Sequence, residues 1–354
     1  MNHLHYGYVK RALQFSFEAI TSRGALKEHK AYLIYVKHPS NPGATGWGEA
    51  SPLKGLSIDD VPDFEDQLKG FLSYLNEGNS PHQIDMGGFP SIRFALETAQ
   101  LDLINGGRRT LFENTFSKGT PIPINGLVWM SSIENMLDQA VKKAQEGFTC
   151  IKFKVGANDH DQECKLLENF RRHFDENKVE IRLDANGAFS AADALHLMKD
   201  FNQFHVHSIE QPIAPKQGEV LEEICAKSSI DIALDEELIG LDPEVDGPKL
   251  LKNLKAKYLI LKPTLLGGMS ASAKWIRKAD EHHMQWWATS ALESNIGLNA
   301  IAQWTAIQKT KLPQGLGTGN LYTNNFDSPL VAEKGTLYYI AQKAWQLPPL
   351  NQAE

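Results

Sequence analysis

Short apolar runs that end in a polar residue recur along this chain at nearly constant spacing. The runs read INGLV, CIKFKV, EIRLDAN, VHSIEQP, IDIALDEE, AKYLILKP and MQWWATS, and the intervals between successive end residues, from Lys154 to Ser290, are 30, 26, 25, 27 and 28 residues. Each interval has room for one amphipathic helix. Seven such βα units predict a parallel sheet and favour a closed barrel over an open, doubly wound sheet. We therefore expect an α/β protein built on a modified (β/α) TIM-type barrel.

The ends of the predicted strands carry mostly charged side chains. In chain order these residues are Lys152, Lys154, Asp184, Glu210, Asp235, Lys262, Ser290 and Glu293. Because the carboxyl ends of barrel strands face one pocket, the three carboxylates would repel one another unless a cation neutralised them. Oxygen ligands without sulfur or clustered histidine suit Mg²⁺, for which Mn²⁺ can substitute. Asp184, Glu210 and Asp235 are the predicted metal ligands.

The lysines predict proton transfer beside this metal. Lys152 and Lys154 are two residues apart and so point to the same face of their strand, whereas Lys262 ends a strand that comes four strands later, across the pocket. A lysine beside a metal and other cations can act as a base, while the metal stabilises a carboxylate that becomes an enediolate. Taken singly, Asp184 or Asp235 suits a helix N-cap, and the KxK pair suits a solvated strand face. Their combination at successive strand ends favours the catalytic interpretation.

The first 120 residues follow a different pattern. A β-type run covers 31–37, and helical periodicity covers 61–75 and 91–104, which predicts an α+β domain. The stretch GWGEASPLKGLS between them is expected to be an ordered loop. Glycines and prolines in 105–123 suggest a domain boundary. We expect a capping domain at 1–120, a barrel at 121–320, and a segment at 321–354 that returns to the capping domain.

Composition argues against several classes of partner. A net charge of -7 gives no reason to expect nucleic acid or an anionic membrane as a partner. The three cysteines, Cys150, Cys164 and Cys225, have no CxxC spacing, which fits a reducing cytoplasm. The start MNHLHYGYVKRALQF lacks the apolar core of a signal peptide, and there is no apolar run of membrane-spanning length. We expect a cytoplasmic protein with a small-molecule carboxylate substrate, and the sequence leaves its oligomeric state open.

Other motifs are given no chemical role. The histidines show no HExxH spacing, so packing is the favoured interpretation for them. Gly315, Gly317 and Gly319 in QGLGTGN do not open an evident helix, which favours a plain loop near the eighth strand over an anion site. Trp286 and Trp287 lie inside an apolar run and are expected to pack in the core or the barrel wall.

The constellation KxK, Asp, Glu, Asp and Lys on successive strands resembles the muconate-lactonizing subgroup of the enolase superfamily. This resemblance covers nearly the whole chain and implies an α+β capping domain on a modified (β/α) barrel. It also implies that Asp184, Glu210 and Asp235 bind magnesium and that Lys154 and Lys262 act on opposite faces of the substrate. Lys152 matches the lysine that helps to bind the substrate carboxylate. Asn186, in DAN, matches a position near the metal and is a predicted substrate contact.

Within this subgroup, GWGEASPL, SIRFALETAQLDL, IEQPI and SALESNIGLNAIAQW are similar to the o-succinylbenzoate synthases. These enzymes dehydrate 2-succinyl-6-hydroxy-2,4-cyclohexadiene-1-carboxylate in menaquinone synthesis, so the resemblance implies that Lys154 takes the α-proton and then assists a syn loss of water. The predicted substrate contacts, beyond Lys152 and Asn186, are Ser290, Glu293, Gly267, Gly268 and the backbone from Gly315 to Gly317. Capping loops at 22–25 and 52–56 are expected to close the site.

Three alternatives remain. The same two lysines could exchange an α-proton, as in an N-acylamino acid racemase or a dipeptide epimerase, but GLGTGN stands where dipeptide epimerases usually carry an acidic DxD pair. A muconate-type cycloisomerase fits the metal and lysine residues but matches ESNIGLNAIAQW less well. A binding protein that has lost its chemistry is disfavoured, because three carboxylates facing lysines are costly to retain without a metal and substrate.

Overall fold

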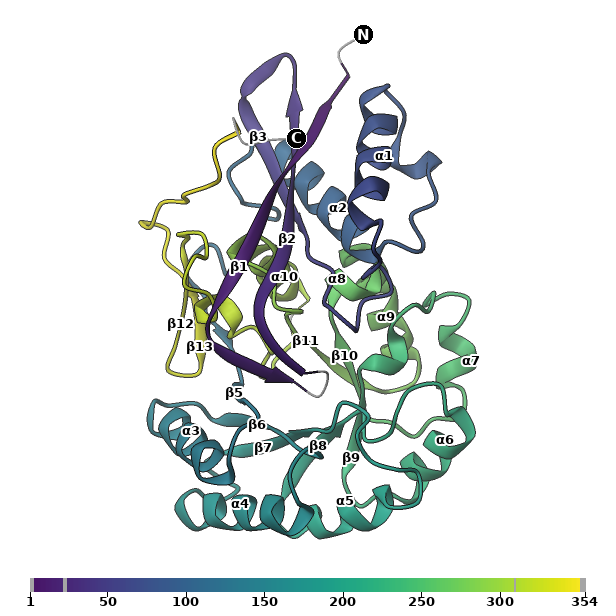
Figure 1. Ribbon diagram of the computed structural model, residues 1–354, viewed down its shortest axis with the longest axis vertical. Helices are drawn as coiled ribbons and strands as arrows, with labels where there is room; N and C mark the ends of the chain where they lie inside the picture. The colour runs from purple at the N-terminus through teal and green to yellow at the C-terminus, as the bar shows by residue number, and fades with distance from the viewer. Residues whose placement is uncertain (1–2, 22–23, 309, 351–354) are drawn as a thin grey trace.

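An antiparallel sheet forms the N-terminal part of the computed structural model, which describes residues 3–21, 24–308 and 310–350. Its strands β1 (His5–Thr21), β2 (Gly24–His38) and β3 (Asn41–Ala50) lie side by side in chain order (Figure 1). Helices α1 (Phe64–Asn76) and α2 (Pro90–Ile104) pack against the sheet, and the short 3₁₀ helix η1 (Pro81–Gln83) lies between them in the chain. Apolar side chains of both layers bury one another, as expected for an α+β capping region.

The prediction of a loop for all of GWGEASPLKGLS is wrong at its start. Residues 46–50 belong to β3 and pair with β2, with Trp47 opposite Tyr35. Gly46 and Gly48 interrupt the β pattern of this strand, yet both have a packing reason. A Cβ at Gly48 would lie 1.9 Å from the Ala95 carbonyl oxygen of α2, so glycine lets the helix backbone approach the strand.

Seven parallel strands form the second sheet, in the order of the chain. They are β5 (Gly126–Val128), β6 (Cys150–Lys154), β7 (Glu180–Asp184), β8 (Val206–Glu210), β9 (Asp231–Leu234), β10 (Tyr258–Leu261) and β11 (Gln285–Ala288). All seven predicted strands are confirmed. The helices α3 (Ile133–Gln145), α4 (His160–His173), α5 (Ala194–Asn202) and α6 (Gly218–Lys227) cover the outside of the sheet in Figure 1. They are followed by α7 (Gly247–Leu251), α8 (Pro263–Leu266), α9 (Met269–Glu281) and α10 (Asn295–Ile307), and by the 3₁₀ helices η2 (Glu236–Leu238) and η3 (Thr318–Asn320).

An extended segment joins the two edges of this sheet. Gln314 forms a parallel bridge to Ile124, just before β5, and Gly315 forms another to Thr289, just after β11. The Gln314 backbone N–H donates to the Pro123 carbonyl at 2.8 Å, and the Gly315 N–H donates to the Ala288 carbonyl at 2.8 Å. The segment thus takes the place of an eighth strand, and the expected barrel closes.

The end of the chain contacts both parts of the molecule. Strands β12 (Leu330–Glu333) and β13 (Thr336–Tyr339) form a small antiparallel sheet with β4 (Ile122–Pro123), which precedes the barrel strands. Before β12, the Leu321 carbonyl accepts the Ser16 N–H of β1 at 2.8 Å. Tyr322 packs against Phe15 with 4.7 Å between ring centroids and an angle of 51° between the ring planes. The C-terminal segment therefore packs on the capping sheet as well as on the barrel.

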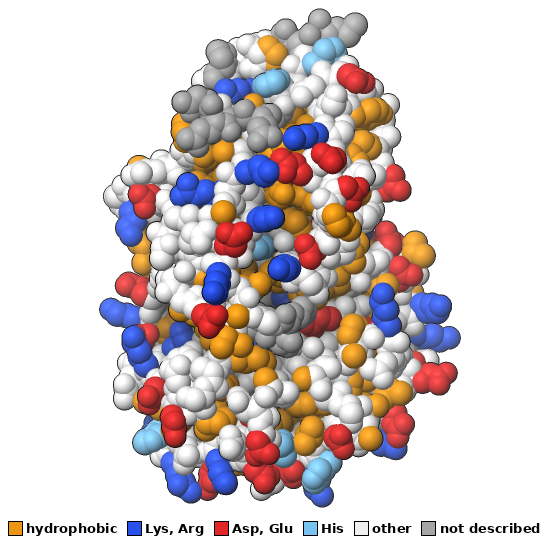
Figure 2. All heavy atoms as spheres, viewed as in Figure 1, with side chains coloured by type: hydrophobic (Ala, Val, Ile, Leu, Met, Phe, Trp, Pro, Cys, Tyr) orange, Lys and Arg blue, Asp and Glu red, His pale blue; other side chains and the backbone are white. Residues whose placement is uncertain are grey.

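Charge is mixed on the face drawn in Figure 2, where acidic and basic side chains are interspersed. Within the described residues, no helix combines the length and the apolar character that crossing a bilayer requires.

Candidate active site

The carboxyl ends of the barrel strands open into a cavity of about 1010 Å³. Its polar floor consists of Lys152, Lys154, Asp184, Asn186 and Lys262. Because alternate residues of a strand face the same side, β6 places both of its lysines inward while the intervening Phe153 packs in the outer core. Apolar side chains form the opposite wall, among them Phe17, Leu53, Leu56, Trp129 and Leu292. A cavity with a few converging charges under an apolar roof is typical of an enzyme site.

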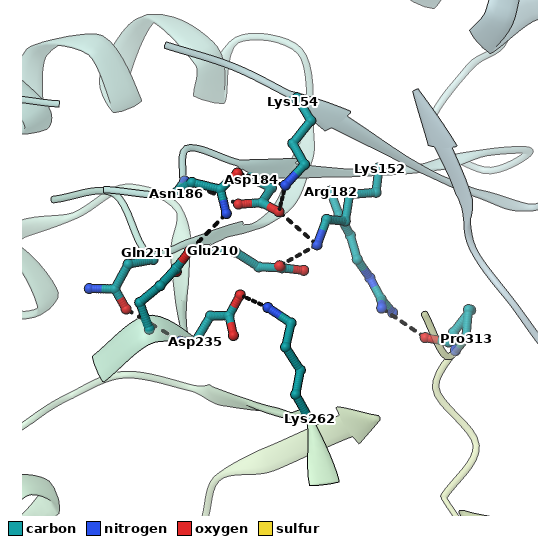
Figure 3. Close-up of polar contacts among 11 residues, drawn as sticks. Lys152, Lys154, Arg182, Asp184, Asn186, Glu210, Gln211, Asp235, Lys262 and Pro313 are labelled. Carbon is teal, nitrogen blue, oxygen red and sulfur yellow. Dashed lines mark hydrogen bonds and ion pairs between the residues drawn. The ribbon is translucent and has the colours of Figure 1, made fainter. Parts of the chain in front are cut away.

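Lys152 lies between two of the three strand-end carboxylates (Figure 3). Its Nζ is 2.8 Å from Asp184 Oδ2 and also donates to Glu210 Oε2. Burial alone would lower the pKa of Lys152, but Asp184 and Glu210 raise it above the ordinary value of lysine. These carboxylates favour the charged form of Lys152, which suits it to holding an anion rather than to taking a proton.

Lys154 lies closer to the opening of the cavity. Its Nζ donates to Asp184 Oδ2 at 2.7 Å and to Asn186 Oδ1 at 2.6 Å. Burial opposes ionisation of Asp184, yet Lys152 and Lys154 hold the pKa of Asp184 well below its usual range. Asn186 has a positive φ of 46°, which asparagine tolerates better than most residues, and this conformation turns its amide toward Lys154.

Lys262 approaches the carboxylates from β10, on the other side of the cavity, and donates to Asp235 Oδ2 (Figure 3). Its side chain is 11% exposed and that of Asp235 is 2% exposed. Burial would lower the pKa of Lys262, but Asp235 and Glu236 raise it. The structure thus brings Lys154 and Lys262 to opposite sides of one group of carboxylates.

The three predicted metal ligands reach the same end of the sheet but are paired with lysines. As the side chains lie, no three acidic, histidine or cysteine side chains in the described part of the chain could hold a metal ion together. Asp184 and Glu210 share Lys152, and Asp235 binds Lys262. Buried Glu210 nevertheless keeps Oε1 without a hydrogen-bond partner, and burial raises its pKa. An all-oxygen donor set with a buried acceptor left over fits a hard divalent cation.

The predicted contacts to the substrate divide into two groups. Ser290 and Gly315 line the cavity beside Lys152 and Asn186. Glu293 is fully buried behind the wall, where it accepts hydrogen bonds from Ser290 and Thr264. Gly267 ends α8 at a φ of 88°, under the Arg93 guanidinium of α2, and is not part of the cavity wall. Glu293 and Gly267 were predicted to touch the substrate, but the structure places neither in the cavity wall, because each packs against neighbouring elements.

Gly268 lies at the same barrel–capping junction as Gly267. A Cβ there would meet the carboxylate of Glu97, which accepts the N–H groups of Met269 and Ser270 at the start of α9. Gly317, in contrast, lines the cavity together with Gly315. Of the glycines predicted to offer backbone contacts, Gly315 and Gly317 line the cavity, whereas Gly267 and Gly268 do not.

The capping region supplies the roof of the site. Leu53 and Leu56, in the predicted loop at 52–56, line the cavity, as does Phe17 of β1. Phe17 meets Trp129, which follows β5, edge to face with 5.3 Å between ring centroids. Residues 22 and 23 of the other predicted loop lie outside the described residues.

Glu236, which follows Asp235 in DEEL, is a site residue that the sequence pattern did not single out. Its Oε1 accepts Asn186 Nδ2 at 2.9 Å. A run of three acidic residues at a strand end was the available signal, but only the structure separates their partners, since the neighbouring Glu237 accepts from Gln211 instead.

Comparisons with known proteins agree with this geometry. A family model described as "Enolase C-terminal domain-like" matches residues 135–342. An o-succinylbenzoate synthase of Desulfotalea psychrophila is 41% identical over 95% of this chain and 99% of its own length. The chain belongs to the enolase superfamily. It falls in the subgroup that includes the muconate-lactonizing enzymes, as expected from the sequence.

Solved structures of this superfamily share the fold. The crystal structure of MenC from D. psychrophila has a TM-score of 0.82 at 39% identity, covering 95% of this chain and 99% of that one. A dipeptide epimerase from Cytophaga hutchinsonii, complexed with Mg and dipeptide D-Ala-L-Val, has a TM-score of 0.79 at 19% identity, covering 100% and 99% of the two chains. An o-succinylbenzoate synthase of Bacillus subtilis is 23% identical over 84% of this chain and 80% of its own length. The C. hutchinsonii epimerase is thus a relative of the same fold that was solved with magnesium.

Proposed function

We propose that this chain catalyses the o-succinylbenzoate synthase reaction of menaquinone biosynthesis. In this reaction 2-succinyl-6-hydroxy-2,4-cyclohexadiene-1-carboxylate loses water to give aromatic o-succinylbenzoate, which makes the enzyme a carbon–oxygen lyase. The observation that carries the proposal is 41% identity to a synthase over 95% of the chain. The three lysines and Asp184 line one cavity. The buried Glu210 and Asp235 pair with Lys152 and Lys262 just behind it. The three cysteines are free thiols, which supports a cytoplasmic location.

Asp184, Glu210 and Asp235 would hold the divalent metal, which we propose to be Mg²⁺, with Mn²⁺ as a substitute. When bound, this ion polarises the substrate carboxylate and stabilises the charge that develops on it. The unpartnered Oε1 of Glu210 supports this assignment. Lys152, whose charge is secured by its two carboxylate neighbours, binds the substrate carboxylate.

Lys154 performs both proton transfers. Its neutral amine removes the proton α to the carboxylate, and the C–H electron pair moves into the carboxylate to give an enediolate. The electrons then return toward the ring, the C–O bond at the neighbouring carbon breaks, and the Lys154 ammonium gives its proton to the departing hydroxyl as water. One residue serves both steps because the proton and the hydroxyl leave from the same face. Lys262 lies across the carboxylates and stabilises the enediolate from the opposite face.

The rest of the cavity binds the remainder of the substrate. The apolar side chains of Phe17, Leu53, Leu56 and Trp129 cover the ring and exclude water. Ser290 and the backbone of Gly315 contact the succinyl arm, with Asn186 close to the reacting end. Exclusion of water strengthens the charge interactions on the polar floor.

The decisive experiment follows loss of the ultraviolet absorbance of the cyclohexadiene substrate in Mg²⁺ or in EDTA. The wild type, Lys154→Ala and the exposed control Lys165→Ala are compared, because Lys165 lies on the outer face of α4. We expect Mg²⁺-dependent turnover that is lost in Lys154→Ala and retained in Lys165→Ala. A well-folded wild type without turnover would exclude the synthase reaction.

Racemisation of an N-acylamino acid is the second candidate. Lys154 and Lys262 both reach the cavity, so an α-proton could be removed on one face and returned on the other. An N-succinyl-L-Arg/Lys racemase of Bacillus cereus is 23% identical over 75% of this chain and 74% of its own length. Exchange of the α-proton of N-succinylamino acids in D₂O tests this activity, and dipeptides serve as the comparison substrate.

A further inference from the structure

Asn186 connects the proposed base to a buried glutamate on another loop. The residue follows β7, and its amide reaches past the end of β8 to Glu236, which follows β9. Its Oδ1 accepts from Lys154 Nζ at 2.6 Å, while its Nδ2 donates to Glu236 Oε1 at 2.9 Å. In Figure 3, Asn186 lies beside the Lys154 amine, and the dashed line on its other side marks the hydrogen bond that its Nδ2 donates.

Lys154 and Glu236 together fix the orientation of the Asn186 amide, with its oxygen toward the lysine and its nitrogen toward the glutamate. A lysine nitrogen offers protons, so it needs the amide oxygen, whereas a carboxylate accepts protons and needs the amide nitrogen. Without Glu236 the amide of Asn186 could rotate by half a turn and present its NH₂ group to Lys154. Glu236 is 7% exposed and so accepts this bond in a place that bulk water hardly reaches.

The orientation matters because of the shape of a neutral amine. Such an amine has two N–H bonds and one lone pair, arranged tetrahedrally. Asp184 and Asn186 accept from two positions on Lys154 Nζ, at 2.7 Å and 2.6 Å. When both acceptors are engaged, the lone pair takes the remaining direction, and Lys154 lines the substrate cavity.

We infer that Glu236, acting through the Asn186 amide, directs the lone pair of Lys154 at the substrate proton and is a positioning residue of the reaction. This assignment rests on the proposed function. Asn186, expected from the sequence to contact the substrate, has this orienting role in addition. The neighbouring Glu237 provides an internal comparison, because it is equally buried but bonds to Gln211 and to the N–H of Lys216.

The test compares Glu236→Leu, Glu236→Gln and the matched control Glu237→Leu at saturating Mg²⁺. Glu236→Leu should lower kcat by about 10- to 100-fold with KM changed by less than about twofold, since a misdirected base slows the chemical step. Glu236→Gln keeps an acceptor oxygen and should restore kcat to within about threefold of wild type, as should Glu237→Leu. The isotope effect at the abstracted C–H should rise in Glu236→Leu.

A double-mutant cycle separates positioning from general damage. Asn186→Gly removes the amide without strain at a positive φ, and we expect it to lower kcat as Glu236→Leu does. If Glu236 acts through Asn186, the double variant loses no more than either single variant. Full additivity, an unchanged kcat in Glu236→Leu, or an equal loss in Glu237→Leu would overturn the inference. So would a loss that is seen below saturating Mg²⁺ and is absent at saturation, because Glu236 adjoins Asp235 and such a loss would reflect weaker metal binding.

The wild type decides first whether the proposed function holds. If it does not turn over the cyclohexadiene, that function fails, and the same variants are compared by α-proton exchange of N-succinylamino acids in D₂O. This exchange needs the same directed lysine and should show the same ranking of variants. A wild type inactive in both assays overturns the positioning role as well.

Discussion

The Glu49 carboxylate accepts the backbone N–H of Ser294 at 2.8 Å, although 245 residues separate them. Glu49 lies at the end of β3 in the capping sheet, and Ser294 is the N-cap of barrel helix α10. The same carboxylate accepts the Gly297 N–H at 2.9 Å and the Ser51 hydroxyl at 2.6 Å. One buried carboxyl group thus satisfies the first turn of α10 and holds the capping region on the barrel beside the cavity.

Removal of this carboxylate should therefore cost much stability. Glu49→Ala leaves the N–H groups of α10 buried without acceptors, and we expect a loss of about 3 kcal/mol or more in the free energy of unfolding. Urea unfolding measures the loss, with the exposed Glu18→Gln on β1 as the control. A Glu49→Ala protein as stable as this control would refute the role of Glu49 in joining the two regions.

Gly48 should not tolerate alanine. The new Cβ would lie 1.9 Å from the Ala95 carbonyl oxygen, and neither backbone can yield cheaply. We expect Gly48→Ala to lose about 3 kcal/mol or more of stability. Gly70 is exposed on α1, and a Cβ added there would have no other atom within 4 Å, so Gly70→Ala should gain about 0.5–1 kcal/mol. Thermal unfolding of the two variants should shift in opposite directions.

Lys262→Met should separate catalysis from folding. We expect kcat to fall by about 10²- to 10⁴-fold, because the enediolate loses the cation on one face. Without Mg²⁺ the variant should also unfold more easily, since Asp235 is left buried without its ammonium partner. Turnover and thermal unfolding, each with and without Mg²⁺, test both effects. Stability unaffected by Mg²⁺ would contradict the place proposed for the metal beside Asp235.

Magnesium should stabilise the folded wild type in the absence of substrate. At a concentration 100-fold above its Kd, a ligand that binds only the native state adds about 2.7 kcal/mol to the free energy of unfolding. EDTA should reverse the shift, and Glu210→Gln should reduce it because one carboxylate ligand is lost. Equal shifts in wild type and Glu210→Gln would remove Glu210 from the metal site. This readout does not depend on knowing the substrate.

His29 should make stability depend on pH. Burial lowers the pKa of His29 to about 4, opposed by the Asp60 carboxylate, and its Nε2 has no partner. Because unfolded histidine has a higher pKa, near 6.5, the unfolded state binds more protons between these values. Stability from this residue is complete above pH 6.5, and about 3 kcal/mol is lost as the pH falls to 4.

His29→Leu should remove this part of the pH dependence, whereas His173→Leu, at an exposed position on α4, should leave it in place. Urea unfolding at a series of pH values measures the difference between the two variants. Identical profiles for His29→Leu and wild type would show that His29 is not the group responsible.

The strands and most helices of the barrel could be predicted because their signal is local. The five-residue runs that begin at Cys150 and Glu180 contain enough apolar residues to predict buried strands. The helix over 133–145 can likewise be predicted from the periodicity of its own residues. The strand at Trp47 was missed because it contains glycines that weaken the local β pattern. These glycines are there to let the backbone of α2 approach, and α2 lies about 50 residues further along the chain. Closure of the barrel by Gln314 was equally hidden, because a two-residue bridge has no period.

By itself, the sequence determined which side chains end the strands, and so which charges share one end of a parallel sheet. It did so because strand length, alternation and spacing are properties of neighbouring residues. Only the tertiary structure decided which side chains pair with one another. It places Lys152 between Asp184 and Glu210, and it lets Asn186 donate a hydrogen bond to Glu236. It also buries Glu293 behind the cavity wall, where it accepts a hydrogen bond from Ser290. These contacts join segments far apart in the chain, so packing of whole elements selects them.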